Sequence, residues 1–528
     1  MKYCGLNKLY LIFSFFILHS LKAQNLRWTY IYPFGQSELA SICNDVCVGN
    51  DGNIYGVGRA ASGFGVIVSL TSDGIERWRF NGFDTISTTW EHLNSVIYAT
   101  DQNLYAVGAR EITATSYHYP VIISLTNSGS IRWIITMPQP CSTGIGFTSI
   151  VEGMYGDIYA IGEMNGDFAV VSFSKQGQIL WTYNYDGGVS NYNEVAYSIT
   201  QDEFGNLYVC GTSYHTGTGW DFTVISLTPS GQERWIYRYS TSNGDRANSI
   251  TYDFNGNIYV CGYSNLTGSG NSSQFIVISL TTEGSERWVR TYQGFPGYSA
   301  DRATSIICDN GNIYVCGRIY HPFGSYNSLA VINFDSNGNE NWFFRYNGPG
   351  NSGGSASAIT NYNGNIYVSS SENYFSVFNL NSNGELLWSY RLGGYRGAFK
   401  GYTTSIESDE YNNIYVGGRY NDSGFVIISL GTSVHKKEDK FFKKTCDILF
   451  SPLFFNNKIV VKFKEKNSVP LNLSIYNILG QKVFEGDYPF KEEIELKDKK
   501  ISSLSKGIYF LKILQNKKEI GKFKIIKK

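Results

Sequence analysis

The chain has 528 residues, of which 16% are aromatic and 17% are charged, and its 44 basic and 44 acidic side chains cancel. The balance hides a split, because residues 25–434 hold nineteen Lys and Arg against thirty-three Asp and Glu, whereas residues 435–528 hold twenty-two Lys against eleven acids. The acidic part argues against a nucleic-acid ligand, and the abrupt change predicts a domain boundary near Leu430.

Residues 1–24 combine Lys2 and Lys8 with the apolar run LYLIFSFFIL and a short polar stretch that ends at Ala23 and Gln24. This order predicts a signal peptide for Sec-dependent export, cleaved near Ala23. The alternative, a membrane anchor, is disfavoured because the apolar run is short and no second one follows. We therefore expect no transmembrane helix in the mature chain.

Two aromatic residues recur along residues 25–434 at intervals of about fifty residues, a period typical of propellers and solenoids. One is the Tyr of an Asn-Ile-Tyr string or a close variant, at Tyr55, Tyr105, Tyr159, Tyr208, Tyr259, Tyr314, Tyr367 and Tyr415. The other is a Trp, at Trp28, Trp78, Trp133, Trp181, Trp235, Trp288, Trp342 and Trp388. The first Trp precedes the first Tyr, so the two series are offset.

One repeat, residues 247–292, consists of four β-rich runs separated by turns, as in a four-stranded antiparallel sheet. Its string IYVCG, residues 258–262, is apolar on both faces, which suits a sheet packed between neighbouring sheets. A Gly lies four residues before seven of the eight Trp residues and predicts one constant hairpin with positive φ. No helical period of comparable length follows residue 24, so the chain is predicted to be all-β.

The offset predicts how the repeats end. The last Tyr string is followed only by FVIISL, residues 425–430, and then by a lysine-rich segment without Trp. The missing fourth strand would come from residues 27–32, and pairing of the two ends would remove open sheet edges. We predict an eight-bladed β-propeller over 25–432, closed by pairing of N- and C-terminal strands, then a linker (433–447) and a small C-terminal β-sandwich (448–528).

Eight of the nine cysteines follow the signal segment, and we interpret them as buried free thiols. Cys210, Cys261 and Cys316 occupy the same position of successive repeats, farther apart than the Cα separation of about 4.4–6.8 Å that a disulfide needs. Cys43 and Cys47 lie four residues apart on one strand and cannot bridge either. No Cys-x-x-Cys metal pattern is present.

The segments that join the second strand to the third, and the fourth to the next repeat, vary in length and are rich in Tyr, Ser, Gly and Asn. Variable segments on a rigid frame usually carry function, and this composition suits sugar stacking or protein contact. We predict a binding module for a glycan or a protein. The candidate ligand-binding residues are Tyr117, His118, Tyr214, His215, Trp220, Tyr320 and His321.

No metal or other cofactor is predicted. The three candidate histidines belong to the second, fourth and sixth repeats, which are too far apart to share a metal ion. The string DFNGN, residues 253–257, is similar to the start of a calcium loop but lacks the distal bidentate Glu.

No catalytic residue is predicted, because no nucleophile elbow, phosphate loop or zinc-protease helix appears. A carboxylate pair for glycoside hydrolysis could still assemble across repeats. The alternative function is therefore a surface polysaccharide-processing enzyme, a lyase or hydrolase, with its site in the central upper funnel. The repeats lack the docking Asp of quinoprotein dehydrogenases and the Asp-x-Gly-x-x-Trp string of sialidases.

The strings GNIYVCGYS (256–264) and FIVISLTTEGSERW (275–288) together resemble the bacterial beta-propeller repeat family SBBP, over about residues 40–430. The resemblance implies a propeller and an exported protein, but no common activity. The family name refers to seven blades, whereas this chain has eight repeats.

Residues 448–528 resemble the type A sorting domain of the type IX (Por) secretion system. The matching motif residues are Tyr476, Gly480, Gly507, Tyr509 and Lys527. The resemblance implies a β-sandwich that is recognised by the secretion machinery at the outer membrane. It also implies a protein that is secreted or attached to the outer-membrane surface.

Overall fold

The computed structural model describes residues 25–32, 41–60, 63–82, 91–112, 117–189, 192–241, 244–253, 255–265, 273–294, 300–321, 326–348, 353–371, 375–392, 401–420, 424–431, 448–450, 454–455, 459–463, 470–477, 481–489, 493–496, 499–515 and 518–527. The chain divides into two compact units, Met1–Val434 and His435–Lys528. The predicted signal peptide (1–24) and linker (433–447) lie outside the described residues.

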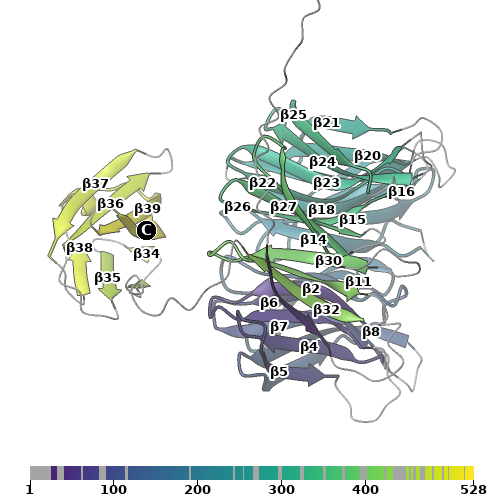
Figure 1. Ribbon diagram of the computed structural model, residues 1–528, viewed down its shortest axis with the longest axis horizontal. Helices are drawn as coiled ribbons and strands as arrows, with labels where there is room; N and C mark the ends of the chain where they lie inside the picture. Colours follow the sequence, from purple (N-terminus) through teal and green to yellow (C-terminus); the bar gives the residue numbers. More distant parts are fainter. Residues whose placement is uncertain are drawn as a thin grey trace, which may run out of the picture. The chain divides into compact units, whose positions relative to one another are not determined.

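The described part of the first unit contains eight four-stranded sheets, and in seven of them the four strands are consecutive in the chain (Figure 1). These seven are β2–β5 (Ile42–Val48, Ile54–Arg59, Gly65–Leu70, Glu76–Asn81), β6–β9 (Glu91–Tyr98, Asn103–Ile112, Tyr117–Thr126, Ile131–Thr136), β10–β13 (Phe147–Glu152, Ile158–Met164, Asp167–Phe173, Ile179–Tyr185), β14–β17 (Val195–Gln201, Leu207–His215, Gly219–Leu227, Glu233–Tyr239), β18–β21 (Arg246–Tyr252, Asn257–Asn265, Ser273–Thr281, Glu286–Tyr292), β22–β25 (Arg302–Asp309, Asn312–His321, Tyr326–Asp335, Glu340–Tyr346) and β26–β29 (Ala356–Tyr362, Asn365–Ser371, Phe375–Leu380, Leu386–Leu392).

A polar network inside the sheets explains why Asp, Tyr, Ser and Arg recur together in the repeats. In β14–β17 the hydroxyl of Tyr208 donates to Asp202 Oδ2 (2.8 Å), and Arg234 Nη1 donates to the same hydroxyl (3.1 Å) and to Ser226 Oγ (2.9 Å). Tyr208 is fully buried, so its hydroxyl requires such partners. The network therefore satisfies the polar end of a core residue.

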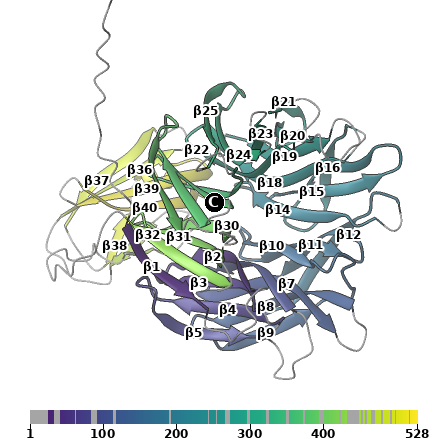
Figure 2. The same ribbon diagram turned by 45° about the vertical axis from the view of Figure 1, so that its right-hand side comes forward.

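The eighth sheet joins the two ends of the repeat region, in the order β1 (Asn25–Ile31), β32 (Phe425–Gly431), β31 (Ile414–Tyr420) and β30 (Gly401–Ser408). Figure 2 shows β1, in purple, along β32, in green. Arg27 Nη1 donates to Tyr415 OH (3.2 Å) and to Ser429 Oγ (3.0 Å), as Arg234 does within a continuous sheet. The N-terminal strand thus takes the position that the offset predicted for it.

The repeated glycines lie against the Trp residues of neighbouring sheets. At Gly284 the backbone φ is +84°, and a Cβ there would lie 2.6 Å from Trp235 Cδ2. Trp235 Nε1 also donates to Thr282 O of the same turn (2.8 Å). All seven glycines have positive φ, which confirms the predicted hairpin: Gly74, Gly129, Gly177, Gly231, Gly284, Gly338 and Gly384.

The strands β2, β6, β10, β14, β18, β22, β26 and β30, here called the inner strands, contact one another in this order, and β30 also contacts β2. Each inner strand has a β-bulge at one residue. An added residue of this kind leaves the ladder and redirects its side chain. In this protein most of the bulged side chains bind the next inner strand.

Six bulged residues donate directly to a backbone carbonyl of the next inner strand. They are Asn44 to Leu93 O (2.8 Å), Asn94 to Phe147 O (2.8 Å), Thr148 to Ala196 O (2.7 Å), Asn248 to Ala303 O (2.6 Å), Thr304 to Ala356 O (2.9 Å) and Thr404 to Cys43 O (2.6 Å). Ser357 acts through Ser371, whose hydroxyl reaches Thr403 O (3.0 Å). Tyr197 is the exception, since its side chain makes no hydrogen bond to another described residue.

The cysteines in the described part of the first unit are free, and most are buried, which confirms their interpretation as structural thiols. Burial raises the pKa of Cys316 to about 12, so this thiol stays protonated and unreactive at neutral pH.

The second unit contains two sheets and one short helix, α1 (Lys499–Ser502). One sheet holds β33 (Ile448–Phe450), β35 (Ile459–Phe463) and β38 (Glu493–Leu496); the other holds β34 (Phe454–Phe455), β40 (Lys518–Lys527), β39 (Gly507–Gln515), β36 (Leu471–Asn477) and β37 (Lys482–Tyr488). Val461 of the first sheet and Leu473 and Leu511 of the second share one hydrophobic cluster. The sheets therefore pack face to face, as in a β-sandwich. Among the described residues no helix could span a membrane.

The contact between Gly284 and Trp235 can be separated from backbone strain by a matched pair of variants. Gly256 has nearly the same φ, +86°, but a Cβ there would meet nothing within 4 Å. Gly284→Ala should therefore destabilise the protein by about 1–3 kcal/mol more than Gly256→Ala, because it adds overpacking to a similar strain. Denaturant unfolding of both variants measures the difference, and equal losses would contradict the packing role of the Trp.

Candidate functional site

A cavity of about 560 Å³ lies among the inner strands β6, β10, β14, β18 and β22. A second cavity of about 440 Å³ shares Ile145, Tyr197, Arg246, Tyr263 and Arg302 with it. We call the two together the inner pocket. Bulged residues line the larger cavity: Asn94, Thr148, Tyr197, Asn248 and Thr304. The size of each cavity suits a small ligand.

Two arginines of the inner pocket stack on tyrosines. Arg246 Cζ lies 3.7 Å from the ring centre of Tyr197, and Arg302 Cζ lies 4.4 Å from that of Tyr263. The Nε atoms of both arginines are buried without a hydrogen-bond partner. Each cation–π contact contributes about 0.5–2 kcal/mol. The tyrosine rings, rather than hydrogen bonds, therefore fix the positions of the guanidinium groups.

A third arginine, Arg318, lines the larger cavity, and its Nε donates to Ala300 O (2.9 Å). Burial and the neighbouring Arg302 lower the pKa of Arg318, while Asp301 opposes the shift. None of the described residues that line the larger cavity is acidic. The cavity therefore presents positive charge within a strongly acidic unit.

The acids nearest to these arginines are engaged in holding the backbone. Asp245 lines the smaller cavity, and its carboxylate accepts hydrogen bonds from Thr241 N (2.6 Å) and Asn265 N (2.9 Å). Asp301 accepts them from Gly294 N (2.6 Å) and Tyr320 N. Each carboxylate thus ties the segment before an inner strand to the hairpin beside it.

Three of the sequence-predicted residues lie together at the end of the β15–β16 hairpin. Tyr214 pairs with Trp220 across the ladder, and their rings meet edge to face at 5.3 Å. The ring of Tyr192 stacks on Tyr214 at 3.4 Å. Trp220 also lines the smaller cavity, so this aromatic cluster borders the inner pocket.

His215, at the end of β15, is held by two partners. Its Nδ1 lies 2.9 Å from Asp221 Oδ2, and its Nε2 lies 3.0 Å from Tyr185 OH. Burial and the charge of Arg238 lower the pKa of His215, whereas Asp221 acts to raise it. This histidine therefore helps to order the hairpin.

The other predicted residues lie on other sheets. Tyr117 begins β8 and is 60% exposed, and the ring of His118 lies 6.5 Å from that of His92. Tyr320 lies on β23 opposite Asn327, and the side chain of His321 lies outside the described residues. Neither Tyr117, His118 nor Tyr320 lines the inner pocket.

The three candidate histidines were expected in the segments that join the second strand of a repeat to the third, and this was wrong. His118 lies within β8, while His215 and His321 are the last residues of β15 and β23. The ladders continue outward, with Tyr214 opposite Trp220 and His215 opposite Gly219. The hairpins are therefore longer, and their turns shorter, than the polar composition suggested.

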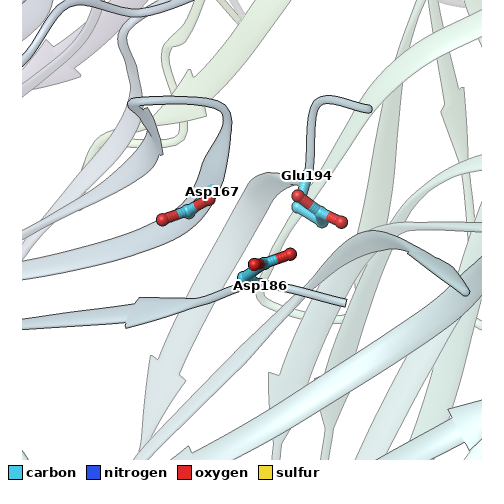
Figure 3. Close-up of side chains that lie close together, drawn as sticks. All are labelled: Asp167, Asp186 and Glu194. Carbon is cyan, nitrogen blue, oxygen red and sulfur yellow. The ribbon is translucent and has the colours of Figure 1, made fainter. Parts of the chain in front are cut away.

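Asp167, Asp186 and Glu194 bring carboxylate oxygens within 4.8 Å of one another (Figure 3). Such oxygens suit a divalent cation, and this is the group of described residues that could hold one. Burial raises the pKa of Glu194 to about 7, and Asp186 adds to the shift. Glu194 also accepts hydrogen bonds from Gly187 N and Tyr214 N, so it already stabilises two backbone segments.

No calcium site is predicted at residues 253–257 because the distal Glu ligand is missing. In the structure, Asp253 makes hydrogen bonds within the chain. Its carboxylate accepts hydrogen bonds from Asn255 N (2.9 Å), Asn257 N (2.8 Å) and Tyr259 OH (3.0 Å). Asp253 accordingly stabilises the connection between β18 and β19.

Sequence reasoning missed Arg246, Arg302, Arg318, Tyr197 and Tyr263. A signal was present, since Arg-Ala begins two successive inner strands, at Arg246 and Arg302. Tyr263 and Arg318 likewise share the position after the Gly of β19 and β23. These positions indicate a common site only when the packing of the inner strands is known.

The sorting-domain residues lie on the second unit's larger sheet. Tyr476 lies on β36, Gly507 begins β39, and the Tyr509 hydroxyl donates to Ser505 O (2.9 Å). Lys527 is buried, and its Nζ donates to Ser502 O (3.2 Å). Gly480 lies outside the described residues.

His92 makes the first unit acid-sensitive in a testable way. Burial lowers the pKa of His92 to about 4, although the hydrogen bond between its Nε2 and Ile145 O (3.2 Å) acts to raise it. A depressed histidine pKa contributes stability above about pH 6.5 that is lost as the pH falls toward 4, because the unfolded chain then binds the proton more tightly. Relative to His92→Gln, the wild-type protein should lose about 1–2 kcal/mol between pH 7.5 and 5. Parallel stability profiles of the two proteins would show that His92 is not responsible.

Two family models match parts of the chain. Residues 454–528 match the secretion system C-terminal sorting domain, and residues 234–268 match the beta-propeller repeat. No curated protein matches the chain.

Among solved structures, the Dos1 propeller is similar at a TM-score of 0.50 and 12% identity, over 78% of this chain and 98% of that one. A protein of unknown function from Bacteroides caccae matches at a TM-score of 0.33 and 14% identity, over 55% and 93% of the two chains. Drosophila Semaphorin 1b, extracellular domains 1–2, matches at 0.42 and 9% identity, over 78% and 88%. At these identities the likeness to the Dos1 propeller concerns the fold alone.

The first unit thus has a propeller-like fold with a beta-propeller repeat at residues 234–268, and residues 454–528 match a type IX secretion sorting domain. That domain engages the type IX secretion machinery and directs a protein to the outer-membrane surface or the extracellular space.

Proposed function

We propose that residues 25–432 form a closed, eight-bladed β-propeller that binds a glycan outside the cell. Support for the ring comes from the eight four-stranded sheets, from β1 in the last sheet, and from the hydrogen bond between Thr404 and Cys43 O. Closure of this kind protects the sheet edges that would otherwise be exposed. The remaining segments of the proposal are a signal peptide at 1–24, a linker at 433–447 and the sorting domain at 448–528.

The inner pocket is the observation that carries the binding function. It is lined by aromatic rings, hydroxyl groups, amides and guanidinium groups, a mixture that suits sugar rings and their hydroxyl groups. Trp220 connects the pocket to the aromatic cluster with Tyr214. Tyr117, His118, Tyr320 and His321 would then belong to a wider contact surface, where a protein ligand is the alternative.

A polysaccharide-processing enzyme is the second candidate function. A hydrolase of the usual kind needs two carboxyl groups about 5–10 Å apart beside the substrate. The described lining of the larger cavity has none, and Asp245 at the smaller one is engaged with Thr241 and Asn265. The arrangement therefore supports binding over hydrolysis.

A glycan array probed with residues 25–528, followed by chromatography of each bound glycan, separates these functions. Binding without product release is expected, and Trp220→Ala should weaken it by about tenfold, since a buried aromatic contact contributes about 1–2 kcal/mol. Tyr411→Ala, which alters a 70% exposed aromatic residue outside the pocket, serves as the control. Released product would favour the enzyme, and the absence of any bound glycan would refute the proposal.

Export gives an independent test. A chain that lacks residues 448–528 should accumulate in the periplasm, because the sorting domain is the part that the outer-membrane machinery recognises. Deletion of residues 1–24 should instead leave the protein in the cytoplasm. Cell fractionation with immunodetection compares both variants with the full chain, and surface exposure of the shortened chain would contradict this role.

A further inference from the structure

The inner pocket concentrates positive charge in a unit that is acidic overall. Residues 25–434 have a net charge of −14, yet Arg246, Arg302 and Arg318 all line one cavity of about 560 Å³. Because no acidic residue is among the described lining residues of that cavity, the net charge of its lining is opposite in sign to that of the unit as a whole.

The guanidinium groups of Arg246 and Arg302 are held by aromatic contacts. Each rests on a tyrosine ring, and neither makes a hydrogen bond or an ion pair with another described residue. Their Nε atoms are buried and unsatisfied. Buried N–H groups without an acceptor are costly, so an acceptor supplied from outside would stabilise this arrangement.

The three positive charges also repel one another. Arg302 contributes to the lowered pKa of Arg318, although Asp301 acts in the opposite direction. An oxyanion between the guanidinium groups would offset that repulsion, and a planar or tetrahedral oxyanion matches the paired N–H groups of arginine. Charge, unsatisfied donors and cavity size therefore converge on an anionic ligand.

We propose that the inner pocket binds the carboxylate or sulfate group of an acidic sugar residue, held by Arg246, Arg302 and Arg318. The inference rests on the proposed glycan-binding function and adds its ligand class. Tyr197 and Tyr263 keep the guanidinium planes fixed, and the neutral hydroxyl and amide groups of the bulged residues receive the sugar hydroxyl groups. A sugar without an acidic group leaves the donors unsatisfied.

Calorimetric titration of residues 25–528 with three sets of oligosaccharides tests the ligand class. The sets are uronic-acid oligomers, sulfated oligomers and neutral oligomers of equal length. At least one acidic set should bind about tenfold more tightly than the neutral set, and its affinity should fall as NaCl rises from about 50 to about 300 mM. The two acidic sets distinguish carboxylate from sulfate.

Two matched variants locate the site. Arg302→Gln should weaken acidic-sugar binding by about tenfold or more, because it removes a charged donor from the pocket. Arg391→Gln is the control, since Arg391 also rests on a tyrosine, 5.1 Å from the ring centre of Tyr346, and has a buried, unsatisfied Nε, but it does not line the pocket. Arg302→Lys keeps the charge and should lose less affinity than Arg302→Gln. Thermal unfolding of each variant confirms that it is folded.

The outcomes separate this inference from the function on which it rests. Neutral oligomers that bind as tightly as acidic ones would overturn the acidic-sugar inference and leave glycan binding intact. Equal losses in Arg302→Gln and Arg391→Gln would also overturn it, because the effect would not come from the pocket. Failure of all three sets to bind would overturn both proposals.

Discussion

The hydrogen bond from a bulged side chain to the next inner strand is the interaction on which the rest of the structure depends. It recurs from Asn44 on β2 to Thr404 on β30, whose hydroxyl reaches Cys43 O on β2. Each bond satisfies a backbone carbonyl that faces the neighbouring sheet, where an unpaired carbonyl would be costly. The bulge is needed because it turns one side chain sideways out of a ladder that is otherwise regular. These bonds tie one inner strand to the next, and they support the eight-bladed ring that we propose.

This interaction is absent between β14 and β18, two of the inner strands that border the inner pocket. Tyr197 holds the bulge position of β14, and its ring supports Arg246 instead of donating to Ala247 O. A cation–π contact thus replaces a hydrogen bond between two inner strands, and it places a guanidinium group in a cavity. The hydrogen bond between β14 and β18 is lost, and a charged binding surface is gained. Departures from the regular pattern of a fold are commonly found at functional sites.

Much of the fold could be predicted because it depends on periodic features. The offset of the Trp and Tyr series placed Trp28 with Tyr415, and the spacing of Gly284 to Trp288 predicted a hairpin with positive φ. The bulges were not predicted, although each one shifts the alternation of buried residues by one position, as in β18, where Ala247 and Ile250 are buried three residues apart. The pocket was missed because Arg246 and Arg318 lie in different repeats and meet only through the packing of inner strands. Among the predicted ligand residues whose side chains the structure describes, only Trp220 lines the pocket, because an aromatic composition does not indicate which way a side chain points.

The central claim is that Tyr197 exchanges a contact between inner strands for a binding site, and Tyr197→Asn tests it most directly. The substituted amide can donate to Ala247 O as Asn248 donates to Ala303 O (2.6 Å). The account predicts that the melting temperature is unchanged or higher and that affinity for an acidic oligosaccharide falls by about tenfold, since Arg246 loses its supporting ring. A lower melting temperature together with unchanged affinity would contradict it.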